Sequence, residues 1–237
     1  DYLTVEIVLQ TYISKKKIKN MKNYLIIGGS SGIGLQSVKL LEGKGHNVYA
    51  TYNSSETPDH GTNVRYFRHN VLEDENTFDH LPDTIDGLVY CPGTIHLKPF
   101  HRIKPETFRA DYDLQVIGAI KTIQAVLPRL KKAEASSIVL FSTIAVQTGF
   151  NFHSVVSASK GAIEGLTRAL AEEFAPLIRV NCITPSLTDT TLAKRLLSSP
   201  EKIDSNAQRH PLKRIGKVND IAGAVAFLLD DNSGWMT

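Results

Sequence analysis

The stretch that decides the fold is Tyr24-Leu25-Ile26-Ile27, followed directly by Gly28-Gly29-Ser30-Ser31-Gly32-Ile33-Gly34. The first four residues have the composition of a buried β-strand, and apolar residues at helical spacing begin at Ile33. A glycine cluster alone is equally typical of a flexible turn. A strand before it and a helix after it favour a backbone cradle for the pyrophosphate of a dinucleotide.

Short β-branched runs and longer helical patterns alternate along the rest of the chain. The predicted strands are Tyr24–Ile27, Asn47–Tyr52, Val64–Phe67, Gly87–Cys91, Ser137–Ser142 and Arg179–Ile183. The predicted helices are Ile33–Leu41, Thr107–Leu130 (as one helix or two), Ser157–Phe174 and Asn219–Leu229. This alternation predicts an α/β fold, a doubly wound parallel sheet of the Rossmann type with helices on both faces.

Composition limits the domain count and the partners. The chain has 237 residues, 42% of them hydrophobic, and a net charge of +3 that is spread along its length. We therefore expect one dinucleotide-binding domain over residues 21–237 and no nucleic-acid partner. Residues 1–20 fall outside the pattern, as upstream translated sequence or a cloning remnant. Their apolar stretch, Leu3–Ile13, is too short and too polar to span a membrane, so no membrane partner is expected.

The two cysteines, Cys91 and Cys182, each lie within an apolar run. Neither belongs to a Cys-x-x-Cys pair or to a metal-ligand spacing with histidine, so no metal site is expected. Buried free thiols in a reducing cytoplasm are the favoured interpretation.

The glycine turn resembles that of the short-chain dehydrogenase/reductase family, whose spacing Gly-x-x-x-Gly-x-Gly is matched by Gly28, Gly32 and Gly34. Three later segments also resemble the family: Cys91-Pro92-Gly93, where the family has Asn-Ala-Gly, the helical stretch 157–162, and Arg179–Pro185. The resemblance runs from Met21 to about Thr237. Within the family, the chain is similar to the 3-oxoacyl-carrier-protein reductases. It implies a nicotinamide nucleotide as cofactor and a small-molecule carbonyl or alcohol as substrate.

The residues at the end of the second predicted strand favour NADP over NAD as the cofactor. An acidic residue there would accept from the ribose 2′-hydroxyl of NAD, but Tyr52, Asn53 and Ser54 supply only hydroxyl and amide groups. No Arg or Lys lies beside them in the sequence, so a pocket that accepts both nucleotides stays open as an alternative. The residues expected at the nucleotide are Gly28, Ser30, Ser31, Gly32, Ile33, Gly34, Tyr52, Asn53, Ser54, Asn70, Val71, Cys91, Pro92, Gly93, Lys160, Pro185, Ser186, Leu187, Thr188 and Thr190.

The resemblance also places the reactive centre, with one residue type missing. The family has a tyrosine four residues before its helical lysine, and the residue four before Lys160 is Val156. Thr143 stands where the family has its serine. Gln115 stands where it has an asparagine, with Asp113 as the alternative alignment. Lys160 is expected to donate to the ribose hydroxyls, although a solvated helix-face lysine is the other interpretation.

A substitute proton donor is sought near Lys160. His153 is the preferred candidate because an imidazole titrates near neutrality, and a histidine that only lines the helix entrance is at least as probable. The segment Pro185–Thr190 resembles the family's loop over the nicotinamide and is also typical of a cap for a helical pattern at Leu192–Leu197. Residues 191–211 are expected to form a mobile substrate cover.

Two functions remain open at this stage. The first is an NAD(P)-dependent oxidoreductase with a rearranged proton donor. The second is an inactive nucleotide-binding module that acts as a redox sensor or oligomer partner. Either would form a homodimer or homotetramer through the helices at 107–130 and 157–174. The stretch Gly234–Thr237 reads as the approach to one further strand, which the chain is expected to lack.

Overall fold

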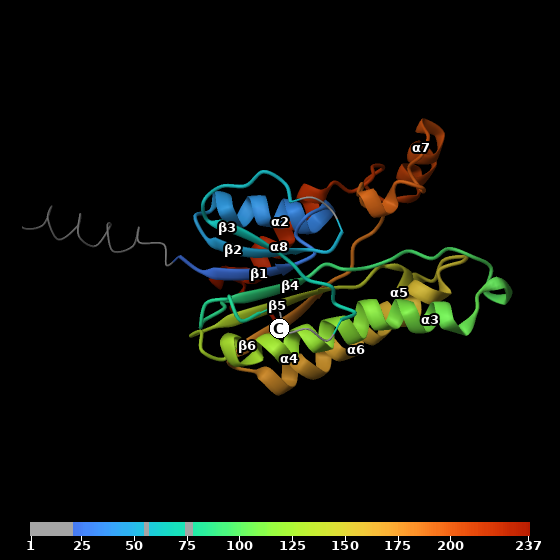
Figure 1. The fold of residues 1–237 in the computed structure, drawn as a ribbon. Helices are drawn as coiled ribbons and strands as arrows, with labels where there is room; N and C mark the ends of the chain where they lie inside the picture. The colour runs from blue at the N-terminus through green and yellow to red at the C-terminus, as the bar shows by residue number, and fades with distance from the viewer. Residues whose placement is uncertain (1–20, 55–56, 74–77) are drawn as a thin grey trace, which may run out of the picture.

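A computed structural model describes residues 21–54, 57–73 and 78–237. The predicted segment 1–20 therefore lies outside the described residues. Within them, six parallel strands form one sheet in the order β3-β2-β1-β4-β5-β6 (Figure 1). The chain places β2 and β3 on one side of β1 and then β4, β5 and β6 on the other. This strand order confirms the doubly wound Rossmann arrangement.

The strands lie within one residue of the predicted bounds. They are β1 (Asn23–Ile27), β2 (Asn47–Tyr52), β3 (Val64–Arg68), β4 (Gly87–Tyr90), β5 (Ser136–Phe141) and β6 (Ile178–Ile183). Their side chains alternate between two cores: Tyr24 and Ile26 of β1 enter one, Leu25 and Ile27 the other. Because both faces are covered, the strands are apolar almost throughout, as a parallel sheet requires.

Helices cover both faces of the sheet. The helices of the described residues are α2 (Gly32–Gly43), α3 (Pro105–Tyr112), α4 (Gly118–Leu130), α5 (Ala145–Thr148), α6 (Ser154–Phe174), α7 (Pro200–Arg209) and α8 (Val218–Leu229). Short 3₁₀ turns are η1 (Phe100–Arg102), η3 (Thr191–Ala193) and η4 (Asp231–Ser233). In Figure 1, α2 and α8 lie on one face and α4 and α6 on the other. Val38 and Leu41 of α2 pack with Val225 and Leu229 of α8 in one core, while Ile123 of α4 and Ile163 of α6 belong to the other.

The predicted helix at 107–130 is two helices joined by a π-helical segment, η2 (Asp113–Ile117). The carbonyl of Leu114 in that segment accepts a hydrogen bond from the Tyr90 hydroxyl at 2.6 Å. Burial raises the pKa of this phenol, so it remains a donor. A π segment is one residue wider than an α-turn, and such bulges often occur at functional sites.

The helix predicted at residues 192–197 does not form. Only the 3₁₀ turn η3 forms there, and the helix α7 begins later, at Pro200. Ser199 caps α7 by accepting from the Lys202 amide at 3.4 Å, and Pro200 occupies the first turn. Proline disfavours a helical residue before it and suits a helix start, which explains the shift. In Figure 1, α7 stands away from the body of the molecule.

The last described residues run along the outer edge of β6. The Asn181 side chain donates to the Met236 carbonyl at 3.0 Å, and the Val180 amide donates to Thr237 Oγ1 at 3.0 Å. These residues do not form a strand, and the expectation that the chain lacks a further strand stays a prediction. Among the residues with described coordinates, no helix has both the length and the apolar character needed to cross a bilayer.

We expect Gly34→Ala to destabilise the fold. An added Cβ at this position would lie 2.2 Å from the Gly28 carbonyl oxygen, and backbone on both sides prevents relaxation. Overpacking of this kind costs about 1–3 kcal/mol, which lowers Tm by roughly 2–10 °C in a chain of this size. Thermal unfolding followed by circular dichroism measures the difference.

The matched control is Gly223→Ala on the exposed side of α8, where nothing lies within 4 Å of the added Cβ. Alanine is the better helix former, so this variant should melt at or above the wild-type temperature. Equal melting temperatures for Gly34→Ala and the wild type would contradict the role given to Gly34.

Candidate functional site

A cleft of about 610 Å³ opens at the carboxyl ends of the strands, where β1 lies between β2 and β4. This is the point at which the strand order reverses and at which open α/β sheets bind ligands. The cleft is bounded by the glycine turn, by residues that follow β2, β3 and β4, and by η3. Its lining comprises Ile27, Gly28, Ser30, Ser31, Gly32, Ile33, Gly34, Thr51, Asn53, Ser54, His69, Asn70, Val71, Leu72, Cys91, Pro92, Gly93, Leu114, Thr190, Thr191 and Leu192.

The glycine turn is held by the two neighbouring strands. The Gly28 amide donates to Thr51 Oγ1 and the Gly29 amide to the Thr51 carbonyl, both at 2.9 Å. The Tyr66 hydroxyl donates to the Gly29 carbonyl at 2.9 Å. Gly28 has φ +75°, a left-handed conformation that favours glycine. These bonds fix the turn before any ligand arrives.

The start of α2 faces the cleft with its amides available. Ser31 is the N-cap, and its side chain makes no capping hydrogen bond. The first amides of a helix have no partner within the helix and attract anions. A Cβ on Gly34 would meet the Gly28 carbonyl, and a Cβ on Gly32 would lie 3.6 Å from Thr190. The loop after β6 thus packs against the turn.

The cleft brings together most of the residues predicted at the nucleotide. Those that line it are Gly28, Ser30, Ser31, Gly32, Ile33, Gly34, Asn53, Ser54, Asn70, Val71, Cys91, Pro92, Gly93 and Thr190. Tyr52, Lys160 and the run Pro185–Thr188 lie outside its lining. Thr190 also caps η3 by accepting from the Ala193 amide at 3.3 Å, so both uses proposed for this loop are compatible.

Sequence reasoning missed several lining residues, namely Ile27, Thr51, His69, Leu72, Leu114, Thr191 and Leu192. Most of them directly adjoin a predicted position, and that adjacency was the available signal. His69 is buried against Phe78, with ring centroids 4.8 Å apart, and burial lowers its pKa. Asn70 accepts from the Leu72 amide at 3.1 Å, which fixes its side chain at the rim of the cleft.

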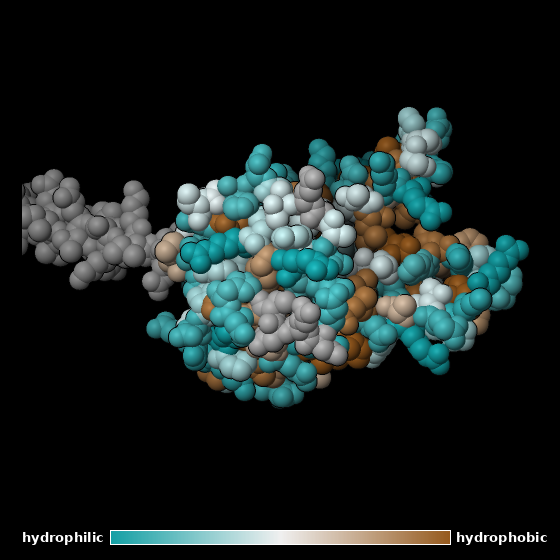
Figure 2. All heavy atoms as spheres, viewed as in Figure 1, coloured by the Kyte–Doolittle hydropathy of each residue, from teal (hydrophilic) through white to brown (hydrophobic). Residues whose placement is uncertain are grey.

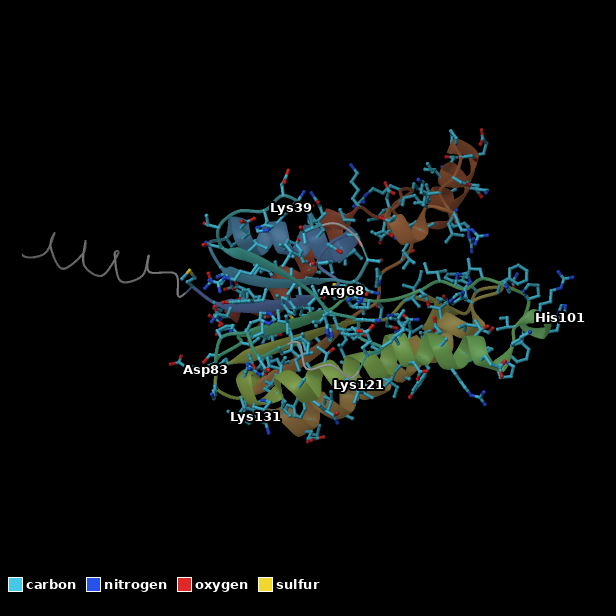
Figure 3. The ribbon with its side chains drawn as sticks, in the orientation of Figure 1. Lys39, Arg68, Asp83, His101, Lys121 and Lys131 are labelled. Atoms are coloured by element: carbon cyan, nitrogen blue, oxygen red, sulfur yellow. The ribbon has the colours of Figure 1, made fainter. Side chains whose placement is uncertain are left out.

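The sequence has no Arg or Lys next to Tyr52, but the fold brings a basic residue beside it. Arg68, the last residue of β3, is the register partner of Tyr52, the last residue of β2. Paired residues of parallel strands project from the same face, about 4.8 Å apart along the sheet. Arg68 is also two residues after Tyr66, which reaches the glycine turn, so the two side chains share that face. Figure 3 labels Arg68 at this end of the sheet.

Lys160 and Gln115 meet at Gly93. A Cβ atom added to Gly93 would lie 3.2 Å from Gln115 Oε1 and 3.8 Å from Lys160 Nζ. Gln115 is fully buried, while Asp113 is exposed on the π segment, so the geometry favours Gln115 over the alternative alignment. Gln115 Oε1 has no hydrogen-bond partner in the described part of the chain.

A buried carboxylate lies behind this pair. Asp111 is 1% exposed and accepts from Gln115 Nε2 at 2.7 Å and from Ser159 Oγ at 2.6 Å. Thr94 Oγ1 donates to its other oxygen. The sequence analysis did not identify Asp111, because helical spacing alone does not reveal a buried carboxylate with three donors.

Burial lowers the pKa of Lys160 from its ordinary value to about 8, and the neighbouring Cys182, Asp111 and Cys91 partly oppose this change. Val156 is 5% exposed, one helical turn before Lys160, where the phenol of the family would stand.

Thr143 is half-buried, and its Oγ1 accepts weakly from the Ala145 amide at 3.3 Å. The hydroxyl hydrogen of Thr143 remains available to a ligand oxygen.

His153 is not brought next to Lys160. It precedes the lysine by seven residues, about 10 Å along α6. Its Nδ1 donates to the Asn151 carbonyl at 2.8 Å, which leaves Nε2 open, and its ring lies against Phe150. Arg209 of α7 stacks over the same Phe150 ring at 5.5 Å. The segment predicted as a substrate cover therefore contacts the loop that carries His153.

Both cysteines are free thiols, as predicted, but they are half-buried rather than fully buried. Across the described ranges, no group of three or more His, Cys, Asp or Glu side chains could hold a metal ion.

Comparison with known proteins agrees with this geometry. The family model described as Enoyl-(Acyl carrier protein) reductase matches residues 28–237. L-xylulose reductase from Bos taurus is 28% identical over 221 residues, 90% of this chain and 91% of that protein. Aldohexose dehydrogenase from Thermoplasma acidophilum superposes with a TM-score of 0.84 at 26% identity, covering 92% of this chain and 90% of that one. ElxO with NADP bound gives 0.82 at 25% identity, covering 92% and 94%. The chain belongs to the short-chain dehydrogenase/reductase family.

Proposed function

We propose that the protein is an NADP(H)-dependent oxidoreductase that interconverts a small-molecule carbonyl compound and its alcohol. The observation that carries this proposal is the continuity of the site. The start of α2 and Gly93 line the same cleft, and Gln115 and Lys160 approach Gly93. A dinucleotide needs such an extended site, with an anion cradle at one end and a polar reacting centre at the other.

The residues present fit a nicotinamide dinucleotide. A Cβ on Gly28 would lie 3.4 Å from Pro92, one on Gly32 would lie 3.6 Å from Thr190, and one on Gly34 would meet the Gly28 backbone. Without these Cβ atoms the turn presents its backbone to the cleft, where a pyrophosphate can approach it. Asn53, Ser54 and Asn70 lie at the adenosine end, and Lys160 would donate to the ribose hydroxyls of the nicotinamide half. The bound cofactor would supply or accept the hydride.

The preference for NADP rests on Arg68. Its guanidinium group projects from the same sheet face as Tyr52, the position that faces the ribose 2′ group in this fold. Arginine matches a phosphate with two parallel hydrogen bonds, and no carboxylate stands at residues 52–54 to repel one. The NADP bound to ElxO supports the same choice.

The substrate would lie beyond Gly93, under the α7 segment. Figure 2 shows hydrophobic residues gathered beneath α7 beside the body of the molecule. Phe150 and Phe152 are among the exposed apolar side chains. Thr143 would donate to the substrate oxygen, and His153 would supply the proton that the missing phenol gives elsewhere in the family.

We propose a homodimer or homotetramer assembled through α4 and α6, which cover the same face of the sheet (Figure 1). We place the protein in the cytoplasm, since its two cysteines are free.

Replacement of the family's tyrosine by Val156 specifically favours a second function, a binding module without turnover. One assay separates the two. Purified protein is mixed with NADPH and a panel of ketones, aldehydes and sugars, and the absorbance of the reduced nicotinamide is followed. We expect oxidation of NADPH that depends on one class of carbonyl compound. Tight NADPH binding with no oxidation would establish the binding module, and no binding would refute both.

Arg68→Leu should weaken NADPH binding by about 10- to 100-fold, since a hydrogen bond to a charged group contributes about 1.5–3 kcal/mol. NADH binding should change little, because NADH has no 2′-phosphate. Fluorescence titration of the reduced nicotinamide measures both dissociation constants.

The matched control is Arg65→Leu. Arg65 is also exposed on β3, but its register partner is Tyr49, whose side chain enters the core on the other face. This variant loses the same charge and should retain wild-type affinity for both nucleotides. A similar loss in both variants, or a loss of NADH affinity in Arg68→Leu, would contradict a phosphate contact.

His153→Ala should lower turnover by about 10²- to 10⁴-fold, the usual contribution of a positioned general acid. The Kd of NADPH should stay at the wild-type value, because His153 does not line the nucleotide cleft. His101→Ala, on the exposed turn η1, serves as the control and should retain full turnover. Undiminished turnover in His153→Ala would assign the proton to water or to the substrate.

A further inference from the structure

The buried carboxylate of Asp111 is not explained by nucleotide binding. It does not line the cleft, yet it is bound by side chains from three separate segments: Thr94 after β4, Gln115 in the π segment and Ser159 on α6. A buried charge is costly unless it is fully hydrogen-bonded or paired. The three donors occupy most of the roughly four acceptor positions of an ionised carboxylate, so the charge is accommodated.

Asp111 determines which end of the Gln115 amide faces Gly93. A carboxylate only accepts hydrogen bonds, so the amide must turn its Nε2 toward Asp111, at 2.7 Å. The carbonyl oxygen Oε1 is then left toward Gly93, buried and without a hydrogen-bond partner among the described residues. Without Asp111, nothing in this contact would distinguish the two orientations of the amide.

We propose that Asp111 is a positioning residue that directs the Gln115 carbonyl oxygen toward Gly93 and supplies the negative charge that balances the Lys160 ammonium. This inference rests on the proposed function for its purpose, because Gln115 and Lys160 are the polar groups at the expected reacting end of the nucleotide. The two groups lie 3.2 and 3.8 Å from one point beside Gly93.

The other groups that face Lys160 are the thiols of Cys182 on β6 and Cys91 after β4. Burial raises the pKa of Cys91 to about 12 and that of Cys182 to about 11, so both thiols are neutral near pH 8. Of the three groups, Asp111 is therefore the anion that opposes the effect of burial on Lys160. Removing its charge should lower the Lys160 pKa further below about 8.

The test measures the titration of Lys160 without nucleotide or substrate. An amine-reactive reagent modifies only the neutral amine, and mass spectrometry of the peptide that contains Lys160 gives the labelling midpoint as pH rises. Asp111→Asn keeps the shape of the side chain and removes the charge. We expect its midpoint to fall by about one pH unit, as for loss of a nearby opposite charge.

Thr94→Val is the matched control, since it removes one hydrogen bond to Asp111 and leaves the carboxylate. Its midpoint should equal the wild-type value. The double variant Asp111→Asn/Gln115→Glu returns one carboxylate to the same pair and should restore the wild-type midpoint. If Asp111→Asn does not fold, the double variant is compared with Gln115→Glu alone, which carries both carboxylates and should have the higher midpoint; equal midpoints would overturn the proposal.

An unchanged midpoint in Asp111→Asn, an equal shift in Thr94→Val, or a lowered midpoint in the double variant would each overturn the proposal. Because no nucleotide is present, these outcomes are independent of the proposed oxidoreductase activity. If the protein turns over NADPH, Asp111→Asn should also shift the pH dependence of the NADPH Kd in the same direction.

Discussion

The close contact between Gly34 and the Gly28 carbonyl is the constraint on which both the fold and the site depend. No side chain fits between them, since a Cβ on Gly34 would lie 2.2 Å from the carbonyl oxygen. The contact lets α2 begin directly after β1, which places the helix N-terminus over the end of the strand. Thr51 and Tyr66 then tie the turn to β2 and β3, so the sheet itself fixes the anion cradle.

A second polar system lies across the cleft and is built differently. Helices rather than strands carry Asp111, Gln115 and Ser159, and a π segment gives Gln115 its place. Burial makes this system demanding, because an unmatched polar atom is costly there, and Gln115 Oε1 is left without a partner among the described residues. It retains the lysine of the family and replaces the phenol by Val156. We propose that a site so altered binds and orients a nucleotide while the proton comes from another group.

The sheet was predicted well because strands covered on both faces appear in the sequence as short, mostly apolar runs; Asn47–Tyr52 was predicted to the residue. It misplaced the helix after β6, since Pro200 and Ser199 shift its start beyond the apolar pattern. Arg68 and Asp111 could not be assigned from spacing: the first depends on strand register and the second on contacts between segments far apart in sequence. Whether His153 donates a proton depends on a substrate pose, which neither periodicity nor spacing determines.

Transfer of hydrogen from the nucleotide to the substrate tests the account most directly. NADPH with deuterium in place of both hydrogens at the reactive carbon of the nicotinamide is incubated with the protein and a carbonyl substrate, and the alcohol product is analysed by mass spectrometry. The account predicts one deuterium on the carbinol carbon, because a nicotinamide cofactor passes its hydride directly to the carbonyl carbon without exchange with water. Recovery of the deuterated nucleotide unchanged, or formation of an alcohol without deuterium at that carbon, would contradict it.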